Sequence, residues 1–419
     1  MPRMKLVKNL VIRMVVLTVA CAVVSPAAAQ MPVKTLFAWS GGGGNPEGNL
    51  VFDSAGNLYG TTSDPGGTTV FQLTPNSDGT WTHNVLWASG LGADPNNVRP
   101  GVVFDAEGNL YSAARLGGNG CGTVFKLTHQ SDGTWTENNL LDFDCGSNGA
   151  YPVTGVTFDT SGNLYGATGL GGAFGNGVIF QLTPNSDGSW TEKVLHHFTG
   201  GSDGAYPDHQ VLVFDSTGNL YGVAALGGQG NCPLFGGSLC GTVFKLTPQA
   251  SGDWAFAVLH TFTGGTDGGN PEATLVFDKS GNLYGTTYGG GKYGFGVAFE
   301  LFPRADGKWG ERVLHAFQGG SDGTYPMGGL IFDSAGNLFG TTLSGGNNQC
   351  GVFNPIGCGI VFKLTPNSTG WTETALARFH GKPNSTPIND LLMDSAGNLY
   401  GAAAGYDTFS DGSVFELTP

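Results

Sequence analysis

The chain contains seven copies of one segment, and each copy includes an aspartate. The residue six positions before this aspartate differs between copies and is of a type that could carry chemistry in several of them. In chain order this position holds Glu47, Arg99, Val153, His209, Glu272, Met327 and Ile388, and Asp208 and Asp390 stand beside it. Carboxylates that converge can hold a divalent cation such as Ca²⁺, and an acid or histidine near like charge can transfer protons. The charged residues of this set form the candidate binding site, and His209 and Glu272 are its candidate catalytic groups.

The alternative is that these charges are solvated at the rim of a channel, because the sequence does not show how close together they lie. No organic cofactor is predicted. The chain lacks a glycine-rich phosphate loop that opens a helix, and it lacks a Gly-x-Ser-x-Gly nucleophile motif between a strand and a helix. Binding of a divalent cation at the charged site is the alternative to a site without a cofactor.

Tyrosines in segments of variable length form a second candidate set. They are Tyr151, Tyr206, Tyr288, Tyr293 and Tyr325. Variable loops on a rigid frame often carry binding, and exposed aromatic rings beside Asn, Asp and Gly can stack on sugar faces. The alternative is that these rings pack the loops against one another.

The strongest signal in the chain is internal repetition. A block of two apolar residues and Phe or Met, followed by Asp-x-x-Gly-Asn-Leu and Tyr or Phe, occurs at Asp53, Asp105, Asp159, Asp215, Asp278, Asp333 and Asp394. A Val-Phe-x-Leu block or a close variant follows each copy, and a Trp-led segment follows six of them. Because the aspartate recurs in every copy, we interpret it as a structural cap of its own hairpin.

Each copy offers four short strands separated by turn signals. In the fourth copy they are expected at 211–214, 220–224, 242–246 and 254–262. The turns contain Gly, which takes positive φ without steric cost. Four antiparallel strands repeated seven times predict an all-β fold, a seven-bladed β-propeller of four-stranded antiparallel blades, with 30–419 as a single domain.

The two ends of the chain predict how the ring closes. The seventh copy has no Trp-led fourth strand, whereas residues 33–39, ahead of the first copy, align with the fourth strands of the other copies. An open solenoid would instead need polar capping repeats. We therefore expect the N-terminal strand to complete the last blade.

Six cysteines fit this map of strands. Strand pairing predicts three disulfides within single repeats, Cys121–Cys145, Cys232–Cys240 and Cys350–Cys358. The first would join the open end of a hairpin, and each of the others would enclose seven residues of one loop. Disulfides suit an exported protein, and the absence of a C-x-x-C spacing argues against a zinc site.

The first 29 residues have the pattern of a signal peptide, with basic residues up to Arg13, an apolar run at 14–24 and a cleavage site near Ala29. A lipobox at Cys21 is the alternative, although Thr18 stands where Leu is usual. We expect a secreted, periplasmic or cell-surface monomer without a membrane span. Once the four basic leader residues are removed from the 18 in the chain, 14 basic and 32 acidic side chains remain, and such a surface repels nucleic acid.

The blocks at 52–62, 70–75 and 200–207 resemble the GloVer-type tandem repeat of exported bacterial proteins, over essentially all of 33–419. The resemblance implies export and a repeat architecture, and it implies no established activity. The Gly-Asn-Leu-Tyr strand is also similar to strands of six-bladed lactonase and NHL-type propellers.

Together these features predict an exported binding or interaction module. Its partner is expected to be an extracellular glycan or protein, recognised through the face that carries the variable loops. The alternative is a propeller enzyme, a polysaccharide lyase or hydrolase or a lactonase, with an acidic channel mouth that binds a metal ion.

Overall fold

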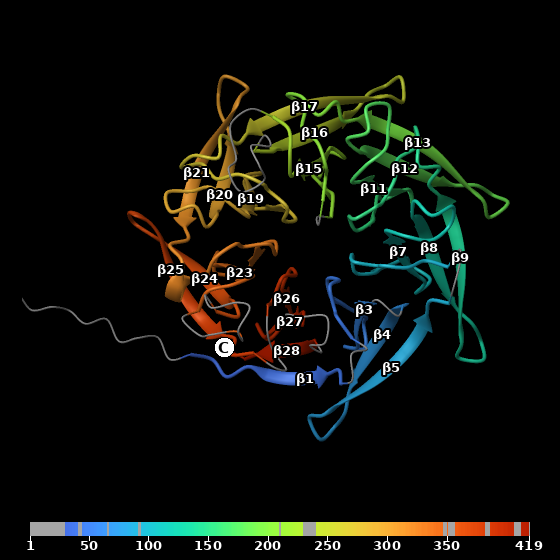
Figure 1. The fold of residues 1–419 in the computed structure, drawn as a ribbon, viewed down its shortest axis with the longest axis horizontal. Helices are drawn as coiled ribbons and strands as arrows, with labels where there is room; N and C mark the ends of the chain where they lie inside the picture. The colour runs from blue at the N-terminus through green and yellow to red at the C-terminus, as the bar shows by residue number, and fades with distance from the viewer. Residues whose placement is uncertain are drawn as a thin grey trace, which may run out of the picture.

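Seven small antiparallel sheets stand around a central axis as the blades of a propeller (Figure 1). The computed structural model describes residues 30–40, 44–64, 67–90, 94–208, 211–228, 240–346, 350, 357–381, 386–405 and 412–418. Each blade has four strands, and in six blades these follow one another in chain order from the axis outward. The predicted all-β, seven-bladed fold is thereby confirmed.

The strands are named A to D from the axis outward. The A strands are β2 (Val51–Phe52), β6 (Val103–Phe104), β10 (Thr157–Phe158), β14 (Val213–Phe214), β18 (Val276–Phe277), β22 (Ile331–Phe332) and β26 (Leu392–Met393). The B strands are β3 (Leu58–Asp64), β7 (Leu110–Ala114), β11 (Leu164–Thr168), β15 (Leu220–Ala224), β19 (Leu283–Thr287), β23 (Leu338–Thr342) and β27 (Leu399–Ala403).

The outer two strands of each blade are longer. The C strands are β4 (Gly67–Pro75), β8 (Thr123–His129), β12 (Val178–Pro184), β16 (Thr242–Pro248), β20 (Val297–Pro303), β24 (Ile360–Asn367) and β28 (Ser413–Leu417). The D strands are β5 (Trp81–Ala88), β9 (Trp135–Asp142), β13 (Trp190–His197), β17 (Trp254–Thr261), β21 (Trp309–Ala316), β25 (Gly370–Arg378) and, in the seventh blade, β1 (Lys34–Ala38).

Helical structure contributes little to the described part of the chain. It consists there of one 3₁₀ turn, η2 (Gly320–Asp322). The described residues contain no helix of the length and apolar character needed to cross a membrane.

The glycine of the repeated Leu-Tyr-Gly block makes room for a phenylalanine of the next strand. Gly166 of β11 pairs with Phe180 of β12, and a Cβ on Gly166 would lie 2.6 Å from the tip of that ring. Phe180 is fully buried. The Gly and Phe positions of the repeat are thus explained as two halves of one packing contact within a blade.

An edge-to-face pair of a tyrosine and a phenylalanine joins neighbouring blades at six of the seven junctions. At the junction of the sixth and seventh blades, Phe339 and Met393 stand at these two positions. Tyr59 of the first blade lies 5.0 Å from Phe104 of the second, with the ring planes at 87°. The same pair closes the ring, since Tyr400 of the seventh blade lies 5.1 Å from Phe52 of the first. This edge-to-face geometry is favourable for aromatic pairs, so one repeated Tyr–Phe contact stabilises six of the seven junctions between blades.

The repeated aspartate caps the hairpin between strands A and B. Asp53 Oδ1 accepts hydrogen bonds from the Ala55 and Asn57 amides, both at 2.9 Å. Asp53 Oδ2 accepts hydrogen bonds from Asn57 Nδ2 at 2.7 Å and from the Tyr59 hydroxyl at 3.0 Å. The structure agrees with the interpretation of these aspartates as structural.

The N-terminal strand completes the seventh blade, as predicted. Strand β1 pairs with β28 in antiparallel register, with Thr35 opposite Phe415. Lys34 Nζ and Glu416 Oε2 form an ion pair at 2.8 Å beside it. Figure 1 shows β1 along the outer edge of the blade formed by β26, β27 and β28.

Two of the three predicted disulfides are present, Cys121–Cys145 and Cys350–Cys358. The third prediction includes Cys232, which lies outside the described residues, as do the expected signal peptide and His209. The first bond joins the open end of the hairpin formed by β8 and β9, and the second lies within the segment between β23 and β24.

Candidate functional site

The segments that join successive blades meet the loops between strands B and C on one face of the ring, here called the loop face. Isolated β-bridges pair Ala150 with Leu170 and Ala205 with Leu226, and the pattern recurs in other repeats. The candidate tyrosines and the charged positions near strand A therefore belong to the same side of the molecule.

Three of the tyrosines sit in a backbone conformation that residues with a Cβ rarely adopt. Tyr151, Tyr206 and Tyr325 have φ angles of 56°, 56° and 57°. The Tyr206 amide donates to the Asn176 carbonyl at 2.9 Å, and the Tyr206 carbonyl accepts from the Ala225 amide at 3.0 Å. Such strain persists where the surroundings impose it, and rigid placement of these rings is the result.

The positions that differ between copies do gather around one cavity, of about 310 Å³. Five of the seven positions that precede a turn aspartate by six residues line it: Glu47, Arg99, Val153, Met327 and Ile388. Glu272 is outside its lining. The ring thus brings together residues contributed by at least five different blades.

Two of the charged candidates form an ion pair. Arg99 Nε lies 3.4 Å from Glu47 Oε2, and both side chains are partly buried. Asn45 Nδ2 donates a 2.8 Å hydrogen bond to Glu47 Oε1. The negative charge of Glu47 is therefore balanced within the cavity wall.

Asp390, two positions after Ile388, forms hydrogen bonds to residues of other blades. Its Oδ2 accepts from Asn49 Nδ2 at 2.8 Å, and its Oδ1 accepts from the Gly329 amide at 2.5 Å. Burial raises the pKa of the Asp390 carboxyl, and hydrogen bonds from Gly329, Thr274 and Asn49 oppose the rise. One carboxyl of the seventh blade is thus bonded to the first and sixth blades.

Sequence reasoning missed Asn49 and Thr274, which precede their turn aspartates by four residues. That position also varies among copies: Asn49, Gly101, Gly155, Val211, Thr274, Gly329 and Asp390. The variation among copies at this position, four residues before the turn aspartate, is the sequence signal that identifies Asn49 and Thr274. In a strand-like segment, residues two apart point to the same side, so both positions face the axis.

Three charged candidates, Asp208, Arg99 and Glu272, and the additional residue Arg115 influence the pKa of Tyr206. Burial raises the pKa of its phenol, Asp208 and Glu272 raise it as well, and the positive charges of Arg115 and Arg99 oppose them. Asp208 is 7% exposed. Arg115, which was not predicted, places its guanidinium 5.4 Å from the centre of the neighbouring Tyr151 ring.

A second aromatic group lies toward the fifth and sixth blades. Tyr288 and Tyr325 stack with ring centres 4.8 Å apart and planes 16° apart. Burial raises the pKa of Tyr288, and the charge of Glu272 adds to it. Tyr293 is separate from this stack, on a loop where its ring is 42% exposed with Lys292 Nζ 5.0 Å from its centre.

The loop face therefore has an arginine-containing aromatic side, around Tyr151 and Tyr206, and a stacked aromatic side, at Tyr288 and Tyr325. Glu272 is electrostatically coupled to tyrosines of both sides. Within the part of the chain that the structure describes, no three His, Cys, Asp or Glu side chains converge closely enough to hold a metal ion.

Comparison with known proteins finds one family model and several similar folds. The model of the Gloeobacter/Verrucomicrobia repeat matches residues 23–236, 193–357 and 235–419. A search among curated proteins finds no match.

Among solved structures, the extracellular domain of the "putative hybrid two component system BT4673 from B. thetaiotaomicron" aligns with a TM-score of 0.56 at 11% identity. The alignment covers 92% of this chain, which spans only 40% of that protein. A Lactobacillus plantarum protein aligns with a TM-score of 0.50 at 14% identity, over 80% of this chain and 86% of that one. At these identities the similarity concerns the fold alone.

The family match extends over the predicted repeats, and the structure shows those repeats as blades. This chain belongs to the Gloeobacter/Verrucomicrobia repeat family, as the resemblance of its repeated blocks had predicted.

Proposed function

We propose that the protein is an exported, monomeric binding module that recognises an extracellular carbohydrate through its loop face. The observation that carries this proposal is the convergence of copy-divergent residues on one cavity of about 310 Å³, beside tyrosines held on constrained backbone. Residues that build a blade recur in every copy, whereas those at the cavity differ, so their variety needs a reason other than folding.

The chemistry of the loop face suits a sugar chain. Rings such as Tyr206 and Tyr288 offer flat apolar surfaces with a hydroxyl at one edge, and the Glu47–Arg99 pair offers acceptors and donors for sugar hydroxyls. Small-ligand sites commonly combine apolar walls with a few convergent polar groups. An extracellular protein ligand would use the same surface.

Binding is favoured over turnover because the described carboxylates at the channel are already engaged. Glu47 pairs with Arg99, and Asp390 accepts hydrogen bonds from Asn49 and Gly329. A general acid or base must reach the substrate. Among the described residues, no group of three His, Cys, Asp or Glu side chains lies at metal-binding distance.

A glycan array followed by calorimetry on the hits would test the proposal. Tyr206→Ala is expected to weaken binding by about tenfold or more, because a stacked ring contributes roughly 1 kcal/mol beyond its buried area. Tyr206→Phe keeps the ring and should retain most of the affinity. Silence on the array and in pull-downs from culture medium would contradict the proposal, as would equal affinities for the wild type and Tyr206→Ala.

Metal removal provides an independent test. We expect the affinity to persist in EDTA, because the described mouth charges are balanced by protein groups. Loss of affinity in EDTA, restored by Ca²⁺, would show that a cation takes part and would return Glu272 and His209 to consideration as ligands. Turnover of a glycan or lactone that is abolished by Glu272→Ala would favour the enzyme alternative.

A further inference from the structure

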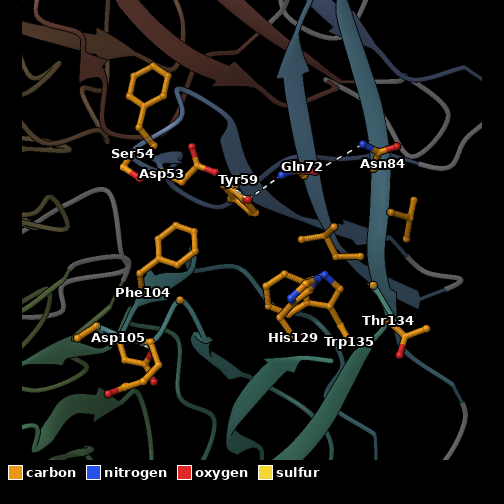
Figure 2. Close-up of a pocket in the computed structure, with 17 residues that line it drawn as sticks. Asp53, Ser54, Tyr59, Gln72, Asn84, Phe104, Asp105, His129, Thr134 and Trp135 are labelled. Atoms are coloured by element: carbon orange, nitrogen blue, oxygen red, sulfur yellow. Dashed lines mark hydrogen bonds between the residues drawn. The ribbon is translucent and has the colours of Figure 1, made fainter. Parts of the chain in front are cut away.

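A second cavity opens on the opposite face, between the first and second blades. Its volume is about 1020 Å³. Figure 2 shows its walls, with Tyr59, Gln72 and Asn84 on the side of the first blade and His129 and Trp135 on the side of the second. We call it the inter-blade groove.

One wall of the groove is a ladder of uncharged polar groups. Gln72 Nε2 donates to the Tyr59 hydroxyl at 2.6 Å, and Asn84 Nδ2 donates to Gln72 Oε1 at 3.5 Å (Figure 2). Amide side chains present both donors and acceptors. Asn84 lies on the exposed surface, so the outer end of the ladder remains open to a ligand.

The facing wall is aromatic. The rings of His129 and Trp135 lie 5.0 Å apart, at an angle of 58°. Val85, the neighbour of Asn84 in the chain, is 53% exposed, which is a large fraction for an apolar side chain. The groove thus places an apolar, partly aromatic surface opposite a row of amides.

Three residues of this groove, Gln72, Asn84 and His129, distinguish these two repeats from the others. The pair opposite each other on strands C and D is Gln72 and Asn84 in the first blade. In the fifth blade the same pair is Glu300 and Arg312, which form an ion pair at 2.7 Å.

No other blade has amides at both places. In chain order the remaining pairs are Lys126/Asn138, Gln181/Lys193, Lys245/Ala257, Lys363/Thr374 and Glu416/Lys34. Where the C-strand residue is Lys, its ammonium lies over the aromatic ring of strand B, as Lys245 lies 5.5 Å from the Tyr221 ring centre. The first blade has no such charge over Tyr59.

His129 is the third departure. The residue paired with the leading tryptophan of strand D is proline in the five other blades that carry this pair: Pro75, Pro184, Pro248, Pro303 and Pro366. The matching groove between the fourth and fifth blades, lined by Pro303 and Trp309, has about 530 Å³. Both neighbouring blades therefore differ from the repeat where they face each other.

We propose that the inter-blade groove is a separate binding site for an uncharged oligosaccharide. Trp135 and His129 stack on a sugar ring, and Gln72 and Asn84 exchange hydrogen bonds with its hydroxyls. The groove lining contains Asp53, Asp105 and Glu107 and no lysine or arginine. Asp105 is paired with Lys126, whose Nζ lies 3.8 Å from its Oδ2. The charges of Asp53 and Glu107 repel anionic glycans, which makes an uncharged chain the matching ligand.

The site is independent of the loop face, since it lies among the hairpins at the other end of the blades. Occupation of both sites would let one molecule hold two glycan chains. Binding of a glycan in the inter-blade groove does not depend on whether the loop face binds sugar.

Calorimetry and tryptophan fluorescence with uncharged hexaoses of glucose, mannose and xylose would test the proposal on the full protein. The double variant Gln72→Glu/Asn84→Arg installs the ion pair that the fifth blade already accommodates, so the fold should be retained. It is expected to weaken binding at this site by about tenfold or more. Trp135→Ala should do the same, and the matched variant Trp309→Ala should leave the affinity unchanged.

Each outcome decides for or against the groove. Weakening by the double variant, with wild-type affinity in Tyr206→Ala, supports it. The absence of binding to every uncharged hexaose overturns it, as does binding that the double variant leaves intact. Binding of choline at the groove in place of the hexaoses would also overturn it, because the acidic rim and Trp135 would then be a cation site.

Discussion

At the scale of single residues, the turn aspartates show how one side chain stabilises a repeat. Burial by itself would raise the pKa of Asp159, but hydrogen bonds from Asn163, Tyr165 and the Ser161 amide outweigh it and lower the pKa. The carboxylate is therefore charged at neutral pH and accepts four hydrogen bonds. A single acceptor group thus fixes both the A–B turn and the tyrosine of strand B.

The sixth blade offers a natural experiment, because Phe339 replaces the tyrosine there and Asp333 Oδ2 accepts from Asn337 alone among side chains. We expect Phe339→Tyr to stabilise the protein by up to about 1 kcal/mol, the net contribution of one hydrogen bond. Tyr165→Phe should destabilise it by a similar amount. Chemical denaturation measures both, and equal stability of all three proteins would show that the hydroxyl contributes nothing.

At the scale of elements, half-buried glutamates of two D strands lie near the loops that follow the preceding D strands. Burial and the charge of Asp144 raise the pKa of Glu192 to about 7, although a hydrogen bond from Asn148 opposes the rise. Burial and the charge of Asp322 raise that of Glu373 to about 7, against Arg378. Each glutamate faces an aspartate supplied by the loop after the preceding D strand.

These glutamates predict a loss of stability as the pH rises from about 5 through neutrality. A carboxyl whose folded pKa lies above its unfolded value of about 4.5 binds its proton more tightly in the folded state. Its contribution is complete below pH 4.5 and is lost as the pH rises through 7. We expect the melting temperature to fall between pH 5 and pH 8, by an amount equivalent to about 1–3 kcal/mol for the two groups together.

The double variant Glu192→Gln/Glu373→Gln should reduce this dependence, and the remainder would come from Glu137 and Glu311, whose pKa burial also raises. Glu107→Gln at an exposed turn serves as the control. The turn aspartates do not interfere, because their lowered pKa values remove stability only as the pH falls below about 4. A wild-type melting temperature that is constant from pH 5 to pH 8 would refute the assignment.

At the scale of the whole molecule, stability depends on closure of the ring by β1. Leu36 of this strand is 8% exposed and packs in a cluster with Leu58, Phe71 and Val414, which come from both ends of the chain. The seventh blade is therefore incomplete without residues that precede the first repeat, and an open edge would remain at β28.

Leu36→Ala should destabilise the protein by about 2–4 kcal/mol, the usual cost of removing a buried leucine side chain. Lys34→Ala removes an ion pair whose lysine is 52% exposed and should cost less than about 1 kcal/mol. Urea denaturation compares them. If the two variants were equally stable, β1 would not be the strand that closes the ring in solution.

Much of the fold could be predicted from the sequence because its signals are local and repeated. The Asp-x-x-Gly-Asn turn, the Leu-Tyr-Gly strand and the Val-Phe-x-Leu strand recur seven times, so each copy supports the assignment of the others. The incomplete seventh copy and the extra strand at 33–39 likewise predicted closure. The predicted pairs Cys121–Cys145, at the open end of a hairpin, and Cys350–Cys358, within one loop, are both present.

The sites were only partly accessible from the sequence. Divergence among copies pointed to positions such as Glu47 and Arg99, which line one cavity, but not to their ion pair. The bond between Asn49 and Asp390 joins residues 341 positions apart, and the inter-blade groove forms from side chains of two separate blades.

The sequence by itself determined the number of blades, the order of their strands and the way the ring closes, because hydrogen-bonded hairpins depend on residues close together in the chain. Only the tertiary structure decided which charges neutralise each other and where cavities open, because the curvature of the ring sets the distances between side chains of different blades.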